Sequence, residues 1–163
     1  MRPLHLIAPI VLSLTATAFA KRPEPGVPAP AFKAEASTGK TVQLSDFKGR
    51  TVVLAFFPKA FTGGCTAEMS GYRDLDRKFG ETGAQVLGIS MDDVATQKKF
   101  AESLKLPFPL LADPTGTVTK AYEVSGGQYA QRVTFVIGKD GKIKKVIEGK
   151  DAIDPNGALD ASK

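Results

Sequence analysis

Runs of apolar residues along this chain predict the strands of a buried sheet. The run over residues 51–57 is β-branched and aromatic, and Pro58 ends it, as is typical of a buried strand. Two later apolar runs flank the turn Asp140-Gly141, which predicts a hairpin. The strands expected from these patterns cover residues 40–44, 51–57, 85–90, 110–111, 132–137 and 142–147.

Apolar residues at helical spacing predict helices between these strands, over residues 65–79, 93–104 and 113–122. The first of these helices ends at Gly80, and Asp92 or Asp93 caps the second. Pro114 takes the favoured first position of the third helix. Strands that alternate with helices and then form a hairpin predict an α/β sandwich with a mixed central sheet.

The length of the chain suits one domain with a real core. We expect this domain to cover residues 31–150. Residues 21–30 are rich in proline and are expected to form an extended arm. Residues 151–163 are expected to be a polar tail that could contain a brief helix.

The first twenty residues have the pattern of a secretory signal peptide. A short charged start is followed by an apolar run that ends in Ala18-Phe19-Ala20. The run is short for a membrane span, so a cleaved signal is favoured over an uncleaved anchor. We therefore expect the protein to be exported, into the periplasm if the cell is bacterial, and to have no membrane attachment after cleavage.

Removal of residues 1–20 would take away Arg2 and no acidic residue, so the formal net charge would fall from +5 to +4. It would also take away His5, the only histidine, which excludes Cys–His proteases and histidine-ligated metal sites. The single cysteine excludes an internal disulfide. The lysines are spread along the chain without a basic motif, which disfavours a nucleic-acid partner.

Cys65 lies where the strand 51–57 turns into the first helix, in the first turn of that helix. Unpaired backbone N–H groups and the positive end of the helix favour an anion there, and the thiolate is the nucleophilic form of cysteine. Thr62 stands three residues earlier, at the spacing of a capping box. The alternative is a small buried cysteine with no catalytic role.

The run P-x-x-x-T-x-x-C, from Pro58 to Cys65, resembles the active-site signature of the peroxiredoxins. Residues 65–74 (CTAEMSGYRD) resemble the bacterioferritin comigratory protein or Q-type subfamily, and the likeness continues through residues 87–90, 106–113 and 132–137. It covers roughly residues 26–149 and implies a thioredoxin-like fold. The chain departs from the pattern at Gly63, where proline is usual, and at Ser70, where the subfamily often has a resolving cysteine.

The resemblance also assigns roles to five residues. Cys65 is the nucleophile, Arg132 faces the thiolate, and Thr62 contacts the sulfur or its substrate. Pro58 shields the sulfur and fixes the loop. Glu68 is a secondary candidate that could orient Arg132 through a charge-assisted hydrogen bond, although an ordinary surface position on the helix is nearly as reasonable. The alternative for Arg132 is a solvated strand end.

These features predict a thiol-dependent peroxidase, in which Cys65 reduces hydrogen peroxide or an organic hydroperoxide and becomes a sulfenic acid. With one cysteine, the reductant must be an external thiol: a thioredoxin-like protein, a glutaredoxin-like protein or a small thiol. No metal, haem or flavin is implied, and we expect a monomer or weak dimer. Two alternatives stay open. A redox-sensing or chaperone-like module could use the same fold, whereas a thiol–disulfide oxidoreductase would need a C-x-x-C pair, and position 62 is threonine.

Overall fold

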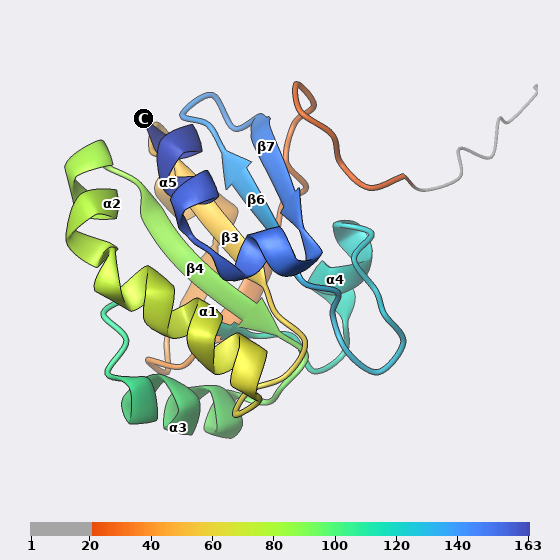
Figure 1. The fold of residues 1–163 in the computed structure, drawn as a ribbon. Helices are drawn as coiled ribbons and strands as arrows, with labels where there is room; N and C mark the ends of the chain where they lie inside the picture. The colour runs from red at the N-terminus through yellow and green to blue at the C-terminus, as the bar shows by residue number, and fades with distance from the viewer. Residues whose placement is uncertain (1–20) are drawn as a thin grey trace, which may run out of the picture.

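The computed structural model describes residues 21–163, so the expected signal peptide lies outside the described residues. A seven-stranded mixed sheet in the order β2-β1-β5-β4-β3-β6-β7 forms the centre of the molecule (Figure 1). Its strands are β1 (Lys33–Ala36), β2 (Thr41–Gln43), β3 (Val52–Phe56), β4 (Gln85–Ser90), β5 (Leu110–Ala112), β6 (Val133–Ile137) and β7 (Ile143–Glu148). The helices are α1 (Gly63–Asp74), α2 (Asp76–Thr82), α3 (Val94–Leu104), α4 (Thr117–Ala121) and α5 (Asn156–Ser162), with 3-10 turns η1 (Leu44–Phe47) and η2 (Gly149–Ile153).

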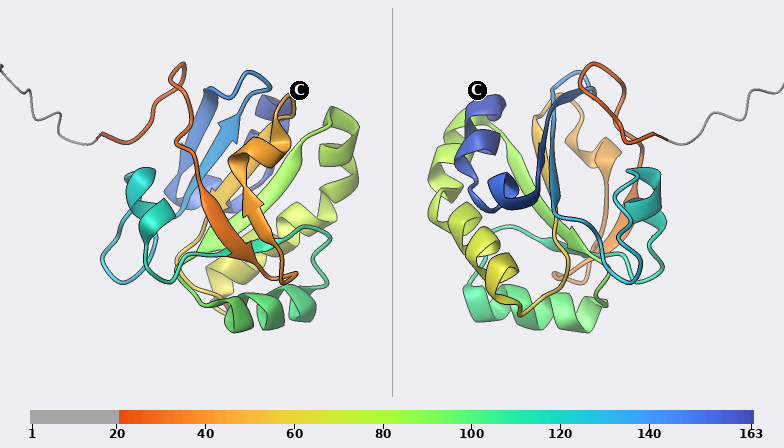
Figure 2. Two further views of the ribbon diagram at one scale, coloured as in Figure 1. Left: turned by 180° about the vertical axis from the view of Figure 1, so that it is seen from behind. Right: turned by 45° about the vertical axis from the view of Figure 1, so that its right-hand side comes forward.

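Helices cover both faces of the sheet, which confirms the expected α/β sandwich. Helices α1, α2 and α5 lie on one face, and α4 lies on the other (Figure 2). Alternate residues of β3 accordingly enter two separate cores, with Val53 in the core under α1 and Leu54 in the core near α4. Because both faces of β3 are buried, its sequence is a continuous apolar run instead of an alternating one.

Strand β3 also determines where the ends of other elements lie. It pairs in parallel with β4 and antiparallel with β6, with Phe56 opposite Val133 and Val52 opposite Ile137. The residues that follow β3 and those that precede β6 therefore lie at the same edge of the sheet. Cys65 and Arg132 belong to these two segments.

Two expectations for the elements were wrong, and one strand was missed. The first helix is broken at Leu75 into α1 and α2 instead of running unbroken to residue 79. Helix α4 begins at Thr117 and not at Pro114, because the buried carboxylate of Asp113 accepts the backbone N–H groups of Val118 and Thr119 and so caps the helix later in the chain. Strand β1 was not expected from the sequence.

The brief helix expected after residue 150 is present as α5, but the expectation that this segment is a polar tail was wrong. Helix α5 packs on β6 and β7, and its residues Ala158 and Leu159 are buried in the core that also contains Cys65. The arm of residues 21–30 is tied to β7 by backbone hydrogen bonds from Gly26 N–H to the carbonyl of Ile143 and from Ile143 N–H to the carbonyl of Val27, both 2.9 Å. The folded unit therefore continues beyond residue 150.

Candidate active site

Cys65 is the third residue of α1, and its side chain is fully buried. The helix begins directly after the loop that follows β3, with Thr62 as the N-cap residue in an extended conformation. The N–H of Thr66 makes the first helical hydrogen bond, to the carbonyl of Thr62 at 2.9 Å. The N–H groups of the residues before Thr66 therefore have no partner within the helix, and they place partial positive charge beside the sulfur.

Arg132 faces this sulfur from the opposite segment. It immediately precedes β6, and its Nη2 lies 3.3 Å from Cys65 Sγ. The N–H of Gly149 donates to the carbonyl of Arg132 at 3.0 Å, which holds its backbone in place. The arginine is therefore not a solvated strand end; it supplies a fixed positive charge at the thiol.

Glu68 lies one helical turn after Cys65 and is the third residue of the cluster that Cys65 and Arg132 form. Its side chain is fully buried and its Oε2 forms an ion pair with Nη1 of Arg132, so the alternative of a surface position for Glu68 is wrong. The guanidinium thus presents one nitrogen to the carboxylate and the other to the sulfur. This contact places Glu68 where it can orient Arg132, as the resemblance implied.

Burial changes the proton affinity of this carboxyl group. Desolvation raises the pKa of Glu68 from 4.5 to about 8, although the charge of Arg132 and its hydrogen bond act in the opposite direction. Below that pH the neutral acid accepts the guanidinium N–H through Oε2, and the contact becomes an ion pair only as the carboxyl group ionises. Burial lowers the pKa of Arg132, but the nearby Glu68 and Cys65 raise it overall, so the guanidinium stays charged. Oε1 of Glu68 has no hydrogen-bond partner in the described part of the chain.

Gly64 makes room for the arginine, a role that the sequence pattern did not indicate. A Cβ atom added at Gly64 would lie 3.0 Å from Nη2 of Arg132. Even alanine at this position would require the guanidinium to shift by a few tenths of an ångström. The sequence offered one signal, a glycine directly before Cys65. That position suggested a role for the backbone N–H of Gly64 and not for its missing side chain.

The loop between β3 and α1 differs from expectation in one respect. The hydroxyl of Thr62 does not cap α1. It donates instead to the carbonyl of Lys59 at 2.8 Å, three residues earlier in the same loop. Asp92 supports the same loop, since its Oδ2 accepts the N–H of Ala60 at 2.8 Å. The cap of α3 is Asp93 alone, and the loop contact of Asp92 was not foreseen. Pro58 is half-buried at the start of this loop.

Exposed aromatic residues lie near the site. Phe61 is 56% exposed, has a φ of +63° and packs on Phe100, so it does not belong to the core. Tyr129 lies in the loop before Arg132, and the ammonium group of Lys59 lies 5.3 Å from the centre of its ring. These residues connect the loop after β3 with the loop before β6.

Residues 21–163 do not meet the requirements of a metal site or of a membrane-spanning helix. No group of three or more histidine, cysteine or acidic side chains in this range could hold a metal ion. None of the helices in the same range is long and apolar enough to cross a bilayer.

Comparison with known proteins gives one consistent result. The AhpC/TSA family model matches residues 25–146. The chloroplastic peroxiredoxin Q of Oryza sativa subsp. japonica is 41% identical over 124 residues, which are 74% of this chain and 57% of the rice protein. The chain thus spans little more than half the length of that relative. Peroxiredoxin Bcp of Bacillus subtilis is 38% identical over 75% of this chain and 83% of its own.

Solved structures agree with this result. The crystal structure of peroxidoxin BcpB from Mycobacterium tuberculosis superposes with a TM-score of 0.80 at 36% identity, and the match covers 86% of this chain and 97% of that one. A Xanthomonas campestris peroxiredoxin Q structure gives a TM-score of 0.75 at 28% identity, over 80% of this chain and 89% of the other. The thioredoxin-like class expected from the sequence is thereby confirmed.

Proposed function

This chain belongs to the AhpC/TSA family, and on that premise we propose that it is a thiol-dependent peroxidase whose nucleophile is Cys65. The observation that carries the proposal is the 3.3 Å contact between Nη2 of Arg132 and the buried sulfur. The curated and structural relatives are named as peroxiredoxins, which supports the same chemistry. Hydrogen peroxide and organic hydroperoxides are the proposed substrates.

The chemistry follows from the charges around the sulfur. The thiolate attacks one peroxide oxygen, an S–O bond forms, and the O–O bond breaks. The departing oxygen gains negative charge, takes up a proton and leaves as water or an alcohol, while Cys65 becomes a sulfenic acid. The guanidinium of Arg132 and the N–H groups at the start of α1 stabilise the negative charge that develops in this step. Their positions are already set before the peroxide arrives.

The second half of the cycle needs an external thiol. Cys65 is the only cysteine in the sequence, so no residue of the same chain can resolve its sulfenic acid. An external thiol attacks the sulfur, releases water and forms a mixed disulfide, which a second thiol then reduces. We propose a thioredoxin-like protein, a glutaredoxin-like protein or a small thiol in this role, acting on a monomer or weak dimer.

Titration of the purified reduced protein with hydrogen peroxide tests the proposed function. Thiol loss that is stoichiometric and far faster than that of free cysteine, with a sulfenic acid as product, is the expected result. The Cys65→Ser protein should show no such reaction. A rate no greater than that of free cysteine would contradict the proposal and would favour a non-enzymatic module on the same fold.

Position 70 offers a test of the one-cysteine cycle. Ser70 lies five residues after Cys65 on α1, about 7.5 Å further along the helix axis. This separation exceeds the roughly 7 Å between α-carbons that a disulfide can span. In the Ser70→Cys protein, oxidation should therefore form an internal disulfide only after α1 unwinds.

Hydrogen exchange measures this unwinding directly. Peroxide should increase exchange across residues 66–74 of the Ser70→Cys protein and leave the same residues of the parent unchanged. Ser103→Cys, on α3, is the matched control and should not open α1. An unwound α1 in the oxidised parent, or a disulfide at position 70 with α1 intact, would contradict this expectation.

We also propose that the protein is exported, on the ground of the signal-like pattern in residues 1–20. Protein secreted by a bacterial host should begin at Lys21 in N-terminal mass analysis. An intact Met1 on protein confined to the cytoplasm would contradict export.

A further inference from the structure

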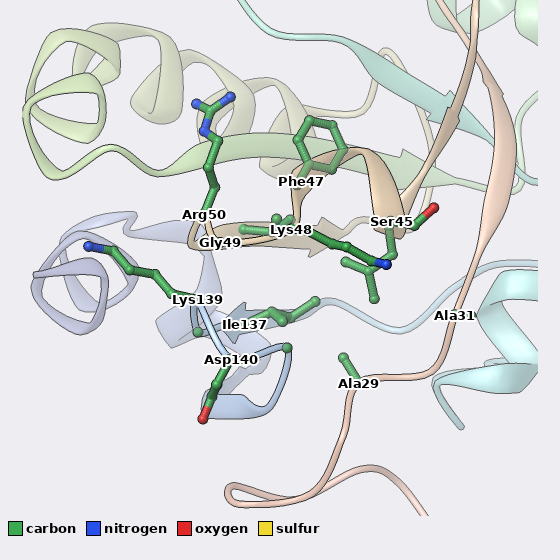
Figure 3. A pocket seen from close by; sticks show the side chains of 14 residues that line it. Ala29, Ala31, Ser45, Phe47, Lys48, Gly49, Arg50, Ile137, Lys139 and Asp140 are labelled. Carbon is green, nitrogen blue, oxygen red and sulfur yellow. The ribbon is translucent and has the colours of Figure 1, made fainter.

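A groove lies on the far side of the molecule from Cys65. It has a volume of about 440 Å³, within the roughly 300–1,000 Å³ typical of small-molecule sites. Figure 3 shows it between the turn that carries Phe47 and Lys48, the arm residues Ala29 and Ala31, and the β6–β7 turn at Asp140. Three segments that are distant in sequence therefore form its walls.

The pairing of β3 with β6 separates this groove from the candidate active site. Val52 and Ile137, which face each other across the two strands, both line the groove. Phe56 and Val133 face each other at the opposite end, beside the segments that carry Cys65 and Arg132. Four residues of strand correspond to roughly 13 Å, so a molecule in the groove would not contact the sulfur.

The lining of the groove is mainly apolar. Val52 and Ile137 are buried, and three further apolar residues are only partly covered: Ala29, Leu44 and Phe47. These three pack against the core on one side, and they also line the groove. A ligand with a hydrocarbon portion would remove this apolar surface from water.

Two cations that line the groove, Lys48 and Lys139, form no ion pair or hydrogen bond with any residue between 21 and 163, but the side chain of Lys139 extends away from Ser45 (Figure 3). The side chain of Lys48, in contrast, extends across the groove toward Ser45 (Figure 3). The other charged groups are differently placed. Arg50 points away and donates from Nε to the carbonyl of Gly83, and Oδ1 of Asp140 accepts the N–H of Lys142 within its own turn.

We propose that this groove binds a single-chain amphiphile with an anionic head group, of the fatty-acid carboxylate class. The carboxylate pairs with the ammonium group of Lys48 next to the hydroxyl of Ser45, and the acyl chain lies over Phe47, Ile137 and Ala29. Apolar surface beside an uncommitted cation matches both parts of such a molecule. The proposal is independent of the chemistry at Cys65.

Sodium decanoate, kept below its micelle concentration, is the probe. In NMR titrations of the purified full chain, the amide signals of residues 47–50 and 138–141 should shift, and those of residues 63–68 should not. Octanoate should bind about 15-fold more weakly, because it buries two fewer methylene groups. Decanol should bind without depending on Lys48.

Substitutions separate the two parts of the site. Lys48→Gln should weaken decanoate about threefold to fivefold, as expected for a partly exposed ion pair, and leave decanol unchanged. Lys78→Gln, at an exposed position on α2, is the matched control and should have no effect. Ala31→Trp should fill the groove and abolish binding of both probes.

Three outcomes would overturn the proposal: no shifts up to the solubility limit, shifts centred on residues 63–68, or equal decanoate affinity in the parent and Lys48→Gln proteins. Unchanged thermal unfolding of Lys48→Gln and Ala31→Trp would show that altered binding does not reflect loss of the fold.

Discussion

Replacing Arg132 with methionine is expected to slow the oxidation of Cys65 by hydrogen peroxide by about 100-fold or more, the usual cost of losing one pre-positioned group that stabilises a developing anion. The comparison is made at equal concentrations of thiolate, measured by its near-ultraviolet absorbance. The loss should persist under that condition, because Nη2 of Arg132 lies 3.3 Å from the sulfur and can also stabilise the departing oxygen. Arg132→Lys should recover only part of the rate, since lysine keeps the charge but not the two-pronged geometry.

A second substitution keeps this test interpretable. Removing Arg132 alone leaves the buried Glu68 without its cation, which is strongly destabilising when the carboxylate is charged. The effect should therefore be measured again in a Glu68→Gln background, with circular dichroism to confirm the fold. If both arginine variants match their parents at equal thiolate concentration, Arg132 does not take part in breaking the O–O bond.

Stability should fall as pH rises from 5 to 8, and Glu68 should be the cause. The pKa of its carboxyl group is raised from 4.5 to about 8 in the folded state by burial. Between these values the unfolded chain has released the proton that the native protein still holds, so each increase in pH favours unfolding. The shift corresponds to a loss of at most about 5 kcal/mol in the free energy of unfolding across this window. Below and above the window both states have the same protonation at this site, and the slope should vanish.

Glu68→Gln should flatten this pH dependence, because glutamine does not titrate. Urea unfolding at several pH values measures it, and both proteins should carry Cys65→Ser so that the thiol does not contribute. Glu81→Gln, an exposed position, is the matched control and should leave the slope unchanged. The lowered pKa values of Asp93 and Asp160 contribute stability that is lost only below about pH 4, outside the window. An equal slope with and without the Glu68→Gln substitution would contradict a native carboxyl that holds its proton to neutral pH.

Many of the elements could be predicted from local pattern. Strands β3 and β4 are continuous apolar runs because both of their faces are buried, and this burial is visible in the sequence itself. Helix α3 has a capping aspartate and an apolar face at the expected positions. Strand β1 was missed because its alternate residues Lys33 and Glu35 are exposed, so it has no apolar run. The packing of α5 was missed because the helix buries only three side chains, those of Ala158, Leu159 and Ser162.

The sequence by itself identified Cys65 as the proposed nucleophile, showed the absence of a second cysteine and, through the family resemblance, predicted that Arg132 faces the sulfur. Only the tertiary structure decided that Glu68 is buried, that its carboxylate pairs with Arg132, and that Gly64 leaves room for the guanidinium. The hydrogen-bond partners of the Thr62 hydroxyl and of Asp92 also became known only from the tertiary structure. The physical reason is that local patterns report propensity and periodicity along one segment. The environment of Glu68 depends instead on an arginine 64 residues away, which the antiparallel pairing of β3 and β6 carries to the start of α1.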